Sequence, residues 1–543
     1  MPNCKNCQSN FSLEEADFEF LKKFDVPAPT FCPDCRNQRR LVFRNDRNFY
    51  RRECGMCKKV IIAIFSEDKP FPVYCKDCYL SDAFDPLQYG VDFDPSRPFI
   101  EQFAEMRARV PRVASFQTQS ENSDYTVHSG KNKNCYMGSS YMECENSYYS
   151  HWLFYAKDCL DLYLCQKMER CYFCTSCDDC YGSAYLENCQ GVSFSYLSFD
   201  CRNSSQLIGC VGLRQKTHQI LNQSASEEEL ASTLKKLNTD PAFRAEFQRK
   251  YDELRLQVPV PEMWVKNSEN VSGNYITNCR NAQHSYNVRE LEDARHVYEV
   301  GHLKDGMDVT HCANGEFIYE VKAVIDLSFS KFCNLCYQSS QLEYCDNCQS
   351  TKNCFGSMGL KGHSYCILNK QYSKEAYESL RAQIIEKMRA TGEYGEFFPA
   401  ALSPFGYNET KAMDHYELTR EEALAKGFKW KDEDPRSYQP QTAVLADDIA
   451  AVPDSITNEI LACSECRKNF KIIPQELKLY RELGVPVPKK CFGCRHKERK
   501  SLQNPRKLWN RECAQCKAAI VTTYGPEKKE RVFCEKCYLA AIY

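Results

Sequence analysis

The sequence predicts a mainly β protein. We expect a central right-handed parallel β-helix, built as two blocks with about 21 residues per rung and with helical inserts, flanked by two duplicated small α+β zinc-ribbon modules. Three observations predict this architecture: an eight-cysteine frame at both ends of the chain, a 21-residue period in its middle, and a similar segment that closes each of two repeat blocks. A chain of 543 residues is too long for one compact core, so several units are expected.

Seven segments follow from these patterns. They are a zinc-ribbon module with two Cys4 sites (1–90), a linker with a short helix (91–113), β-solenoid block 1 (114–222), a helical insert (223–260), β-solenoid block 2 (261–370), a helix with an extended linker (371–460) and a second zinc-ribbon module (461–543). In the insert, Ser226 with Glu229 predicts a capped helix from Glu227 to Leu237. Further helices are expected from Ala242 to Leu256 and from Lys374 to Met388.

Each terminal module carries four knuckles, which are Cys-x-x-Cys pairs. Module 1 has Cys4/Cys7, Cys32/Cys35, Cys54/Cys57 and Cys75/Cys78, and module 2 has Cys463/Cys466, Cys491/Cys494, Cys513/Cys516 and Cys534/Cys537. Every cysteine of module 2 lies 459 residues after its counterpart, so the spacing is kept without insertion or deletion. Two thiolates at this spacing bind one tetrahedral ion, and two knuckles complete a set of four. The sequence therefore predicts four zinc ions, each held by four cysteines.

The order in which knuckles share an ion is open between two arrangements. The β-rich run Val60 to Phe65, followed by a turn and the short return Pro72 to Tyr74, predicts a zinc-ribbon hairpin between the third and fourth knuckles. This favours sequential pairing, the first knuckle with the second and the third with the fourth; the alternative is a cross-brace. Because catalytic zinc usually keeps a water and uses histidine or carboxylate ligands, a Cys4 frame predicts structural zinc that supplies folding energy.

A basic segment lies between the second and third knuckles of each module. The residues expected to bind nucleic acid are Arg36, Arg40, Arg44, Arg47, Tyr50 and Arg52 in module 1, and Arg495, Arg499, Arg506, Trp509 and Arg511 in module 2; all except Arg44 have a basic or aromatic counterpart in the other copy. Basic residues interleaved with aromatics are typical of nucleic-acid binding, with RNA favoured over DNA. The alternative is that these arginines neutralise the negative charge of the Cys4 sites. In that case the protein is an interaction scaffold for other proteins.

Composition limits the remaining classes of function. The chain has 71 basic and 73 acidic residues, so any polyanion must be met by a local patch. The start of the chain has no signal-peptide pattern, no run is apolar enough to span a membrane, and the 35 cysteines are spaced for thiolates in a reducing compartment. These observations predict a cytoplasmic protein without a membrane partner, and leave the oligomeric state open. Because no nucleophile motif, phosphate loop or dinucleotide fingerprint is present, we expect no enzymatic activity.

The middle of the chain repeats with a short period. From Cys135 to Cys210, and again from Cys279 to Cys366, every cysteine stands at a position divisible by three. In rows of 21, small and apolar residues fall into columns, such as Cys159, Cys180 and Cys201, and the second block repeats the columns 147 residues later. Cysteine is small and readily buried, so it suits the interior of a solenoid. The alternative is a further metal site; its ligands would be Cys171, Cys174, Cys177 and Cys180.

One polar column offers a weaker alternative. It holds Asp158, Asp179 and Asp200, matched by Asp305, Asp326 and Asn347. Such residues usually close turns by binding backbone donors. On a β-helix they would otherwise serve as the paired carboxylates of a carbohydrate-active enzyme.

Four runs carry a resemblance to a known family. They are Val26 to Arg36 (VPAPTFCPDCR), Phe43 to Arg47 (FRNDR), Tyr74 to Tyr79 (YCKDCY) and Ser403 to Thr410 (SPFGYNET). Together they resemble a family of zinc-knuckle, cysteine-rich repeat proteins from candidate-phyla (Patescibacteria) bacteria. The resemblance covers most of the chain and implies a bacterial cytoplasm, but it implies no activity. Relatives tend to have tryptophans after the fourth knuckle, where this chain has Tyr79 and Leu80.

Overall fold

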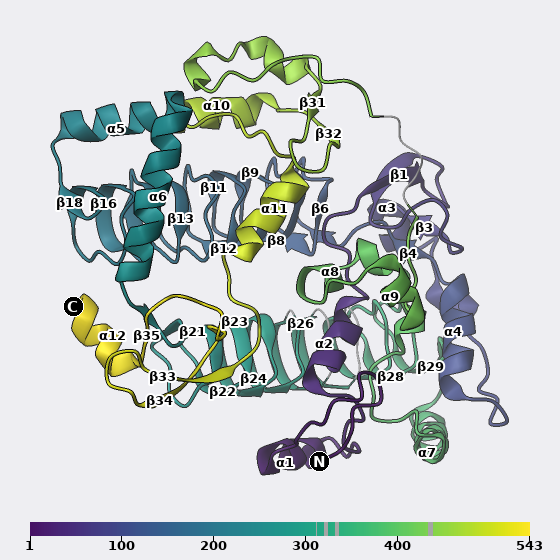
Figure 1. The fold of residues 1–543 in the computed structure, drawn as a ribbon. Helices are drawn as coiled ribbons and strands as arrows, with labels where there is room; N and C mark the ends of the chain where they lie inside the picture. The colour runs from purple at the N-terminus through teal and green to yellow at the C-terminus, as the bar shows by residue number, and fades with distance from the viewer. Residues whose placement is uncertain (311, 320–323, 332–335, 433–437) are drawn as a thin grey trace. The chain divides into compact units, whose positions relative to one another are not determined.

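A computed structural model describes residues 1–310, 312–319, 324–331, 336–432 and 438–543 (Figure 1). The chain forms two compact units, and each unit combines two segments that are distant in the sequence. Unit 1 contains Met1–Ser115 and Trp264–Asp432, and unit 2 contains Phe116–Met263 and Glu433–Tyr543. Module 1 therefore belongs to the same unit as the second repeat block, and module 2 to the same unit as the first. The seven segment boundaries stay predictions.

The first repeat block, residues 116–224, is named coil 1. Its strands are β5 (Gln117–Thr118), β6 (Thr126–Val127), β7 (Ser129–Gly130), β8 (Gly138–Met142), β9 (Glu145–Tyr148), β10 (His151–Phe154), β11 (Lys157–Leu160), β12 (Tyr163–Gln166), β13 (Ala184–Glu187), β14 (Gln190–Ser193), β15 (Tyr196–Phe199), β16 (Arg202–Ile208), β17 (Thr217–Ile220) and β18 (Gln223–Ser224). Most pairs are parallel and join residues twelve positions apart; His151, for example, lies between Ser139 and Tyr163.

The predicted rung of about 21 residues is therefore wrong, because the register gives one circuit every twelve residues. The backbone explains the shorter circuit. From His128 to Asp179 every third residue has a φ between 45° and 57°, which is a left-handed conformation. The chain turns at each of these residues, and we call each one a corner. Both periods are multiples of three, so both place the same residues inside. The interior does contain the cysteines at positions divisible by three, all of them buried in coil 1.

Interior side chains stack by the twelve-residue register. Cys165, Cys177, Cys189 and Cys201 form one buried column, in which the backbone N–H of Cys177 donates to Cys165 Sγ at 3.5 Å and that of Cys189 donates to Cys177 Sγ at 3.4 Å. The predicted columns of 21 are wrong for the same reason. A step of 21 residues is one circuit plus nine residues, so Asp158, Asp179 and Asp200 stand at different corners and form no ladder.

The second repeat block, residues 265–371, is named coil 2 and forms one eleven-stranded, curled sheet. Its strands are β20 (Val265–Lys266), β21 (Gly273–Thr277), β22 (Arg280–Gln283), β23 (Ser285–Arg295), β24 (Tyr298–Met307), β25 (Cys312–Tyr319), β26 (Val324–Lys331), β27 (Cys336–Glu343), β28 (Lys352–Phe355), β29 (Ser364–Ile367) and β30 (Lys370–Gln371). Neighbouring strands are parallel except for β29 and β30. From β21 onward the parallel strands again pair twelve residues apart, as Tyr286 does with Tyr298.

Helices make the fold mixed α/β, which corrects the mainly β class. The described residues contain twelve α-helices: α1 (Glu15–Lys23), α2 (Pro33–Leu41), α3 (Lys76–Leu80), α4 (Phe99–Arg109), α5 (Glu227–Thr239), α6 (Pro241–Gln257), α7 (Lys374–Thr391), α8 (Ala412–His415), α9 (Arg420–Ala425), α10 (Pro474–Leu483), α11 (Phe492–Ser501) and α12 (Glu535–Ile542). The predicted helices of the insert are confirmed, including the capping box of Ser226 with Glu229. None of the described helices combines the length and apolarity that a membrane crossing requires.

The two modules repeat the same short elements. Their strands are β1 (Tyr50–Glu53), β2 (Val60–Ala63) and β3 (Val73–Tyr74) in module 1, and β31 (Leu461–Ala462), β32 (Asn469–Phe470), β33 (Trp509–Glu512), β34 (Ala519–Thr522) and β35 (Val532–Phe533) in module 2. The hairpin predicted between the third and fourth knuckles is wrong. Strand β2 pairs with β1, so the third knuckle is itself the hairpin turn, while β3 pairs with β4 (Arg112–Val113).

Candidate metal centres and arginine clamps

The sixteen knuckle cysteines gather into four tetrads. They are Cys4, Cys7, Cys32 and Cys35; Cys54, Cys57, Cys75 and Cys78; Cys463, Cys466, Cys491 and Cys494; and Cys513, Cys516, Cys534 and Cys537. Within each tetrad the sulfur atoms all lie within 4.8 Å of one another. Knuckles therefore pair sequentially, and the cross-brace alternative is excluded.

The sulfur spacing fits a tetrahedral metal ion. The Sγ atoms of Cys7 and Cys32 are 3.7 Å apart and those of Cys57 and Cys75 are 3.9 Å apart. In module 2, Cys466 and Cys491 are 3.6 Å apart. Zinc–sulfur bonds of about 2.3 Å in a tetrahedron place the sulfurs about 3.8 Å apart. Each tetrad could therefore hold one metal ion.

Two local structures position the sulfurs. The first knuckle of every tetrad is followed directly by a residue with a φ of 62° or 63°, namely Gln8, Lys58, Arg467 and Lys517. The second knuckle begins a helix: its first cysteine is the N-cap of α2, α3, α11 or α12. Free N–H groups and the positive end of the helix favour thiolates at this position. A tetrad thus joins one tight turn to one helix N-terminus.

Backbone donors also reach the cysteine that opens each tetrad. The N–H of Cys75 donates to Cys54 Sγ at 3.2 Å, and the equivalent bond from Cys534 to Cys513 is 3.3 Å. Burial by itself raises the pKa of Cys54, but hydrogen bonds from backbone N–H groups outweigh burial and lower this pKa to about 6. The same balance lowers the pKa of Cys513 to about 6. These sulfurs are prepared to bind a cation as thiolates.

No known family model and no curated protein matches this chain. The geometry of the tetrads and of the residues around them is therefore the basis for proposing a function.

The basic segment of module 1 faces an acidic corner of coil 2. Arg36 Nε donates to Asp308 Oδ2 at 2.7 Å, and Arg40 Nη1 lies 3.5 Å from Asp308 Oδ1. Arg40 also donates from Nε to Thr310 Oγ1 at 3.3 Å. All three charged side chains are fully buried, at 0% exposure. We name Arg36, Arg40 and Asp308 clamp 1.

Module 2 makes the equivalent contact with coil 1. Arg495 Nε donates to Asp161 Oδ2 at 2.7 Å, and Arg499 Nη1 donates to Asp161 Oδ1 at 2.6 Å. Arg499 also donates to the carbonyl of Tyr149 at 3.1 Å. We name Arg495, Arg499 and Asp161 clamp 2; Figure 1 shows its helix, α11, beside β12. The arginines of the two clamps are 459 residues apart and the aspartates 147, the same offsets that relate the modules and the coils.

A second pair of contacts follows the same offsets. The tyrosine after the fourth knuckle meets the coil in both units: Asn347 Nδ2 donates to Tyr79 Oη at 2.6 Å, and Tyr538 Oη donates to Asp200. Asp200 and Asn347 belong to the predicted polar column. Each of these two residues therefore attaches a module to a coil.

The remaining basic and aromatic residues of the segments are also occupied. Arg44 pairs with Asp46, Arg47 with Asp414, Tyr50 donates to Glu409, Arg52 donates to the Ser66 carbonyl, Trp509 lies under Lys507, and Arg511 donates to the carbonyls of Tyr524 and Gly525. Arg44 is buried; Arg47, Tyr50, Arg52, Arg506, Trp509 and Arg511 are half-buried. The five most buried guanidinium groups face carboxylates of their own unit, so the structure does not support a nucleic-acid interface there.

Sequence reasoning missed Asp161 and Asp308. Both stand at left-handed corners, with φ of 56° and 60°. The available signal was their separation of 147 residues, the offset already found between the blocks.

The alternative metal site in the middle of the chain is not supported. The structure places no candidate metal tetrad there among the described residues, and the cysteines concerned were Cys171, Cys174, Cys177 and Cys180. Of the polar column, Asp326 lies outside the described side chains, and Asp305 lies 3.5 Å from Lys23.

One buried carboxyl makes clamp 2 sensitive to pH. Burial raises the pKa of Glu476 to about 7, and Arg495, at 3.7 Å, offsets this only in part. The pKa of Glu476 is higher in the folded chain than in the unfolded chain, where it is near 4.3. The folded state is therefore favoured at low pH, where Glu476 is protonated, and this contribution to stability is lost as pH rises through 7. Between about pH 5.5 and 8.5 we expect the free energy of unfolding to fall by about 2 kcal/mol, and Glu476→Gln to remove that slope.

Urea titrations at several pH values measure this slope. Glu482 is the matched control, since it lies on the same helix but is exposed and pairs with Lys478 at 3.8 Å. Glu482→Gln is expected to keep the slope of the unchanged protein. An unchanged slope in Glu476→Gln contradicts the prediction.

Proposed function

We propose that this chain is a non-enzymatic, zinc-stabilised scaffold for protein interaction. Four zinc ions, one in each tetrad, hold two zinc-ribbon modules in shape. Each module clamps one β-solenoid, and the solenoid side is the surface offered to a protein partner. A cytoplasmic location belongs to the same proposal, because thiolates and zinc persist in reducing surroundings.

The matched clamps carry this proposal. Two arginines of each module face one buried aspartate of the coil. The Nε bond of the first arginine is 2.7 Å long in both units, whereas the second arginine lies 3.5 Å from the aspartate in clamp 1 and donates to it at 2.6 Å in clamp 2. A buried ion pair of this kind fixes which surfaces meet and in which register. The arginines thus have an internal role, and the tetrads beside them have no feature of catalytic zinc, since every ligand is a thiolate.

Zinc is the metal that the donors favour. Four thiolates in a tetrahedron are typical of zinc or of iron–sulfur chemistry, and structural zinc commonly uses two Cys-x-x-Cys pairs. Helix N-termini and backbone N–H groups then stabilise the charge that remains on the sulfurs.

The full chain should be purified at moderate salt, and its metal, nucleic acid and cross-linked partners identified. We expect four zinc ions per chain, no co-purifying nucleic acid, and protein adducts that survive nuclease after cross-linking in cells. RNA affinity should be tested at several salt concentrations with Lys497→Glu and Lys507→Glu, which change exposed cations of module 2. RNA binding that falls steeply with salt and weakens in these variants would overturn the proposal.

A further inference from the structure

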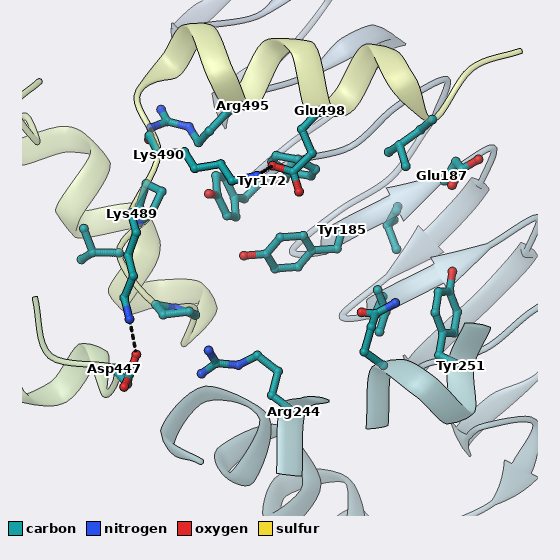
Figure 2. Close-up of a pocket in the computed structure, with 18 of the residues that line it drawn as sticks. Tyr172, Tyr185, Glu187, Arg244, Tyr251, Asp447, Lys489, Lys490, Arg495 and Glu498 are labelled. Atoms are coloured by element: carbon teal, nitrogen blue, oxygen red, sulfur yellow. Dashed lines mark hydrogen bonds and ion pairs between the residues drawn. The ribbon is translucent and has the colours of Figure 1, made fainter. Parts of the chain in front are cut away.

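An open cavity of about 680 Å³ lies in unit 2 between coil 1, helix α6 and module 2 (Figure 2). Coil 1 contributes Tyr172, Phe173 and Tyr185, α6 contributes Arg244, and module 2 contributes the wall around Val487. Figure 2 shows that Tyr185 and Arg244 both point into this space. The volume is within the range of about 300–1,000 Å³ that small-molecule sites occupy.

The coil wall of the cavity is aromatic. The rings of Tyr172 and Tyr185 meet edge to face with centroids 5.4 Å apart, and the Phe173 and Tyr185 rings are also 5.4 Å apart. Packing between them holds the Tyr185 ring in place, while that residue stays half-buried. A fixed, half-exposed aromatic ring offers a flat surface for another planar group.

Arg244 is a cation of the cavity whose charge is only partly balanced, because Asp447 interacts with it from beyond ion-pair distance. Its Nε donates to the Leu237 carbonyl at 2.6 Å and its Nη2 to the Asn238 carbonyl at 3.1 Å, which fixes the guanidinium. Among the described residues no carboxylate forms an ion pair with it. The neighbouring cations differ, since Lys489 pairs with Asp447 at 2.9 Å and Lys490 with Glu498 at 3.1 Å.

We propose that this cavity binds a small planar aromatic anion. The ring of the ligand packs on Tyr185 and Phe173, and its anionic group binds Arg244 with charge-assisted hydrogen bonds. Nucleoside monophosphates and aromatic carboxylates share this chemistry. No tetrad cysteine lines the cavity, although Ser464 and Lys490 beside the third tetrad do, and the site does not depend on the proposed scaffold function.

Calorimetry on the full-length, zinc-loaded chain tests the site with two probes, adenosine 5′-monophosphate and indole-3-acetate. We expect at least one probe to bind saturably, and Arg244→Ala to weaken it about tenfold or more. Arg249→Ala is the matched control, because Arg249 lies on the same helix, is exposed and pairs with Glu253. It should leave the affinity unchanged. Ribose 5-phosphate, which lacks the ring, should bind about tenfold more weakly than the monophosphate if that probe binds.

The two probes also identify the source of the anion. Preference for the monophosphate assigns a phosphate ligand, and preference for indole-3-acetate assigns a carboxylate; both support the site. Arg244→Lys keeps the charge and should retain part of the affinity, which separates a binding role from a folding role. Saturable binding of neither probe, or equal affinity in Arg244→Ala, overturns the proposal.

Discussion

Removing the metal is expected to unfold both modules. Each tetrad joins a turn to a helix through four sulfurs, and modules of this size bury too little apolar surface to fold without that link. Structural zinc supplies on the order of 10 kcal/mol or more per site. A strong chelator should therefore lower the thermal midpoint sharply, and returning zinc should restore it. Circular dichroism follows the unfolding, and mass spectrometry counts the bound ions.

Single-cysteine variants make this prediction specific. Cys57→Ser removes one ligand of one tetrad, so the zinc count should fall from four to three while the other three tetrads keep their ions. Cys210→Ser is the matched control, because Cys210 is buried in coil 1 outside the tetrads. It should leave the count unchanged. A metal-free chain with the same thermal midpoint as the metal-loaded one contradicts the structural role.

Asp161→Asn is expected to destabilise unit 2 by about 3–5 kcal/mol. The substitution keeps the shape of the side chain but removes the charge that balances two buried arginines, Arg495 and Arg499. Breaking one side of a buried ion pair leaves an uncompensated charge in a poorly solvated place, and that desolvation is the main cost. Chemical unfolding monitored by fluorescence measures the loss. Asp308→Asn should repeat the effect in unit 1 through Arg36 and Arg40.

An exposed aspartate of the same coil provides the control. Asp179 lies 3.9 Å from Lys167, and both side chains are largely exposed, so Asp179→Asn should change stability by less than about 1 kcal/mol. In a double-mutant cycle, Asp161→Asn combined with Arg499→Met should cost less than the two single changes added together. Additive losses, or equal losses for Asp161 and Asp179, would show that the clamp does not hold the unit.

The cysteine frame was predictable because metal ligation is a local pattern. A Cys-x-x-Cys pair specifies a turn from four residues, and the constant offset of 459 identified both copies. The rung length was not predictable in the same way. Inward residues recur every third position, which periods of twelve and 21 satisfy equally, and only the hydrogen bonds between distant strands select one of them.

The partners of the arginines were also beyond sequence reasoning. Arg36 and Asp308 are 272 residues apart, and Arg495 and Asp161 are 334 apart. A run of cations looks the same whether it meets solvent, phosphate or a carboxylate of its own chain. Tertiary packing decides among these, and the offset of 147 residues shows only that Asp161 and Asp308 are equivalent positions, not that they meet the arginines.

The alternating order of the two units along the chain determines when each unit can be completed during synthesis. Arg36 leaves the ribosome long before Asp308 exists, and at about 5–20 residues per second the delay is about 15–55 s. Coil 1 must wait longer still, until the last tenth of the chain supplies Arg495 and Arg499. During the first interval module 1 carries arginines without their aspartate, and during the second coil 1 carries Asp161 without its arginines. Zinc capture by module 1 can begin before either unit closes.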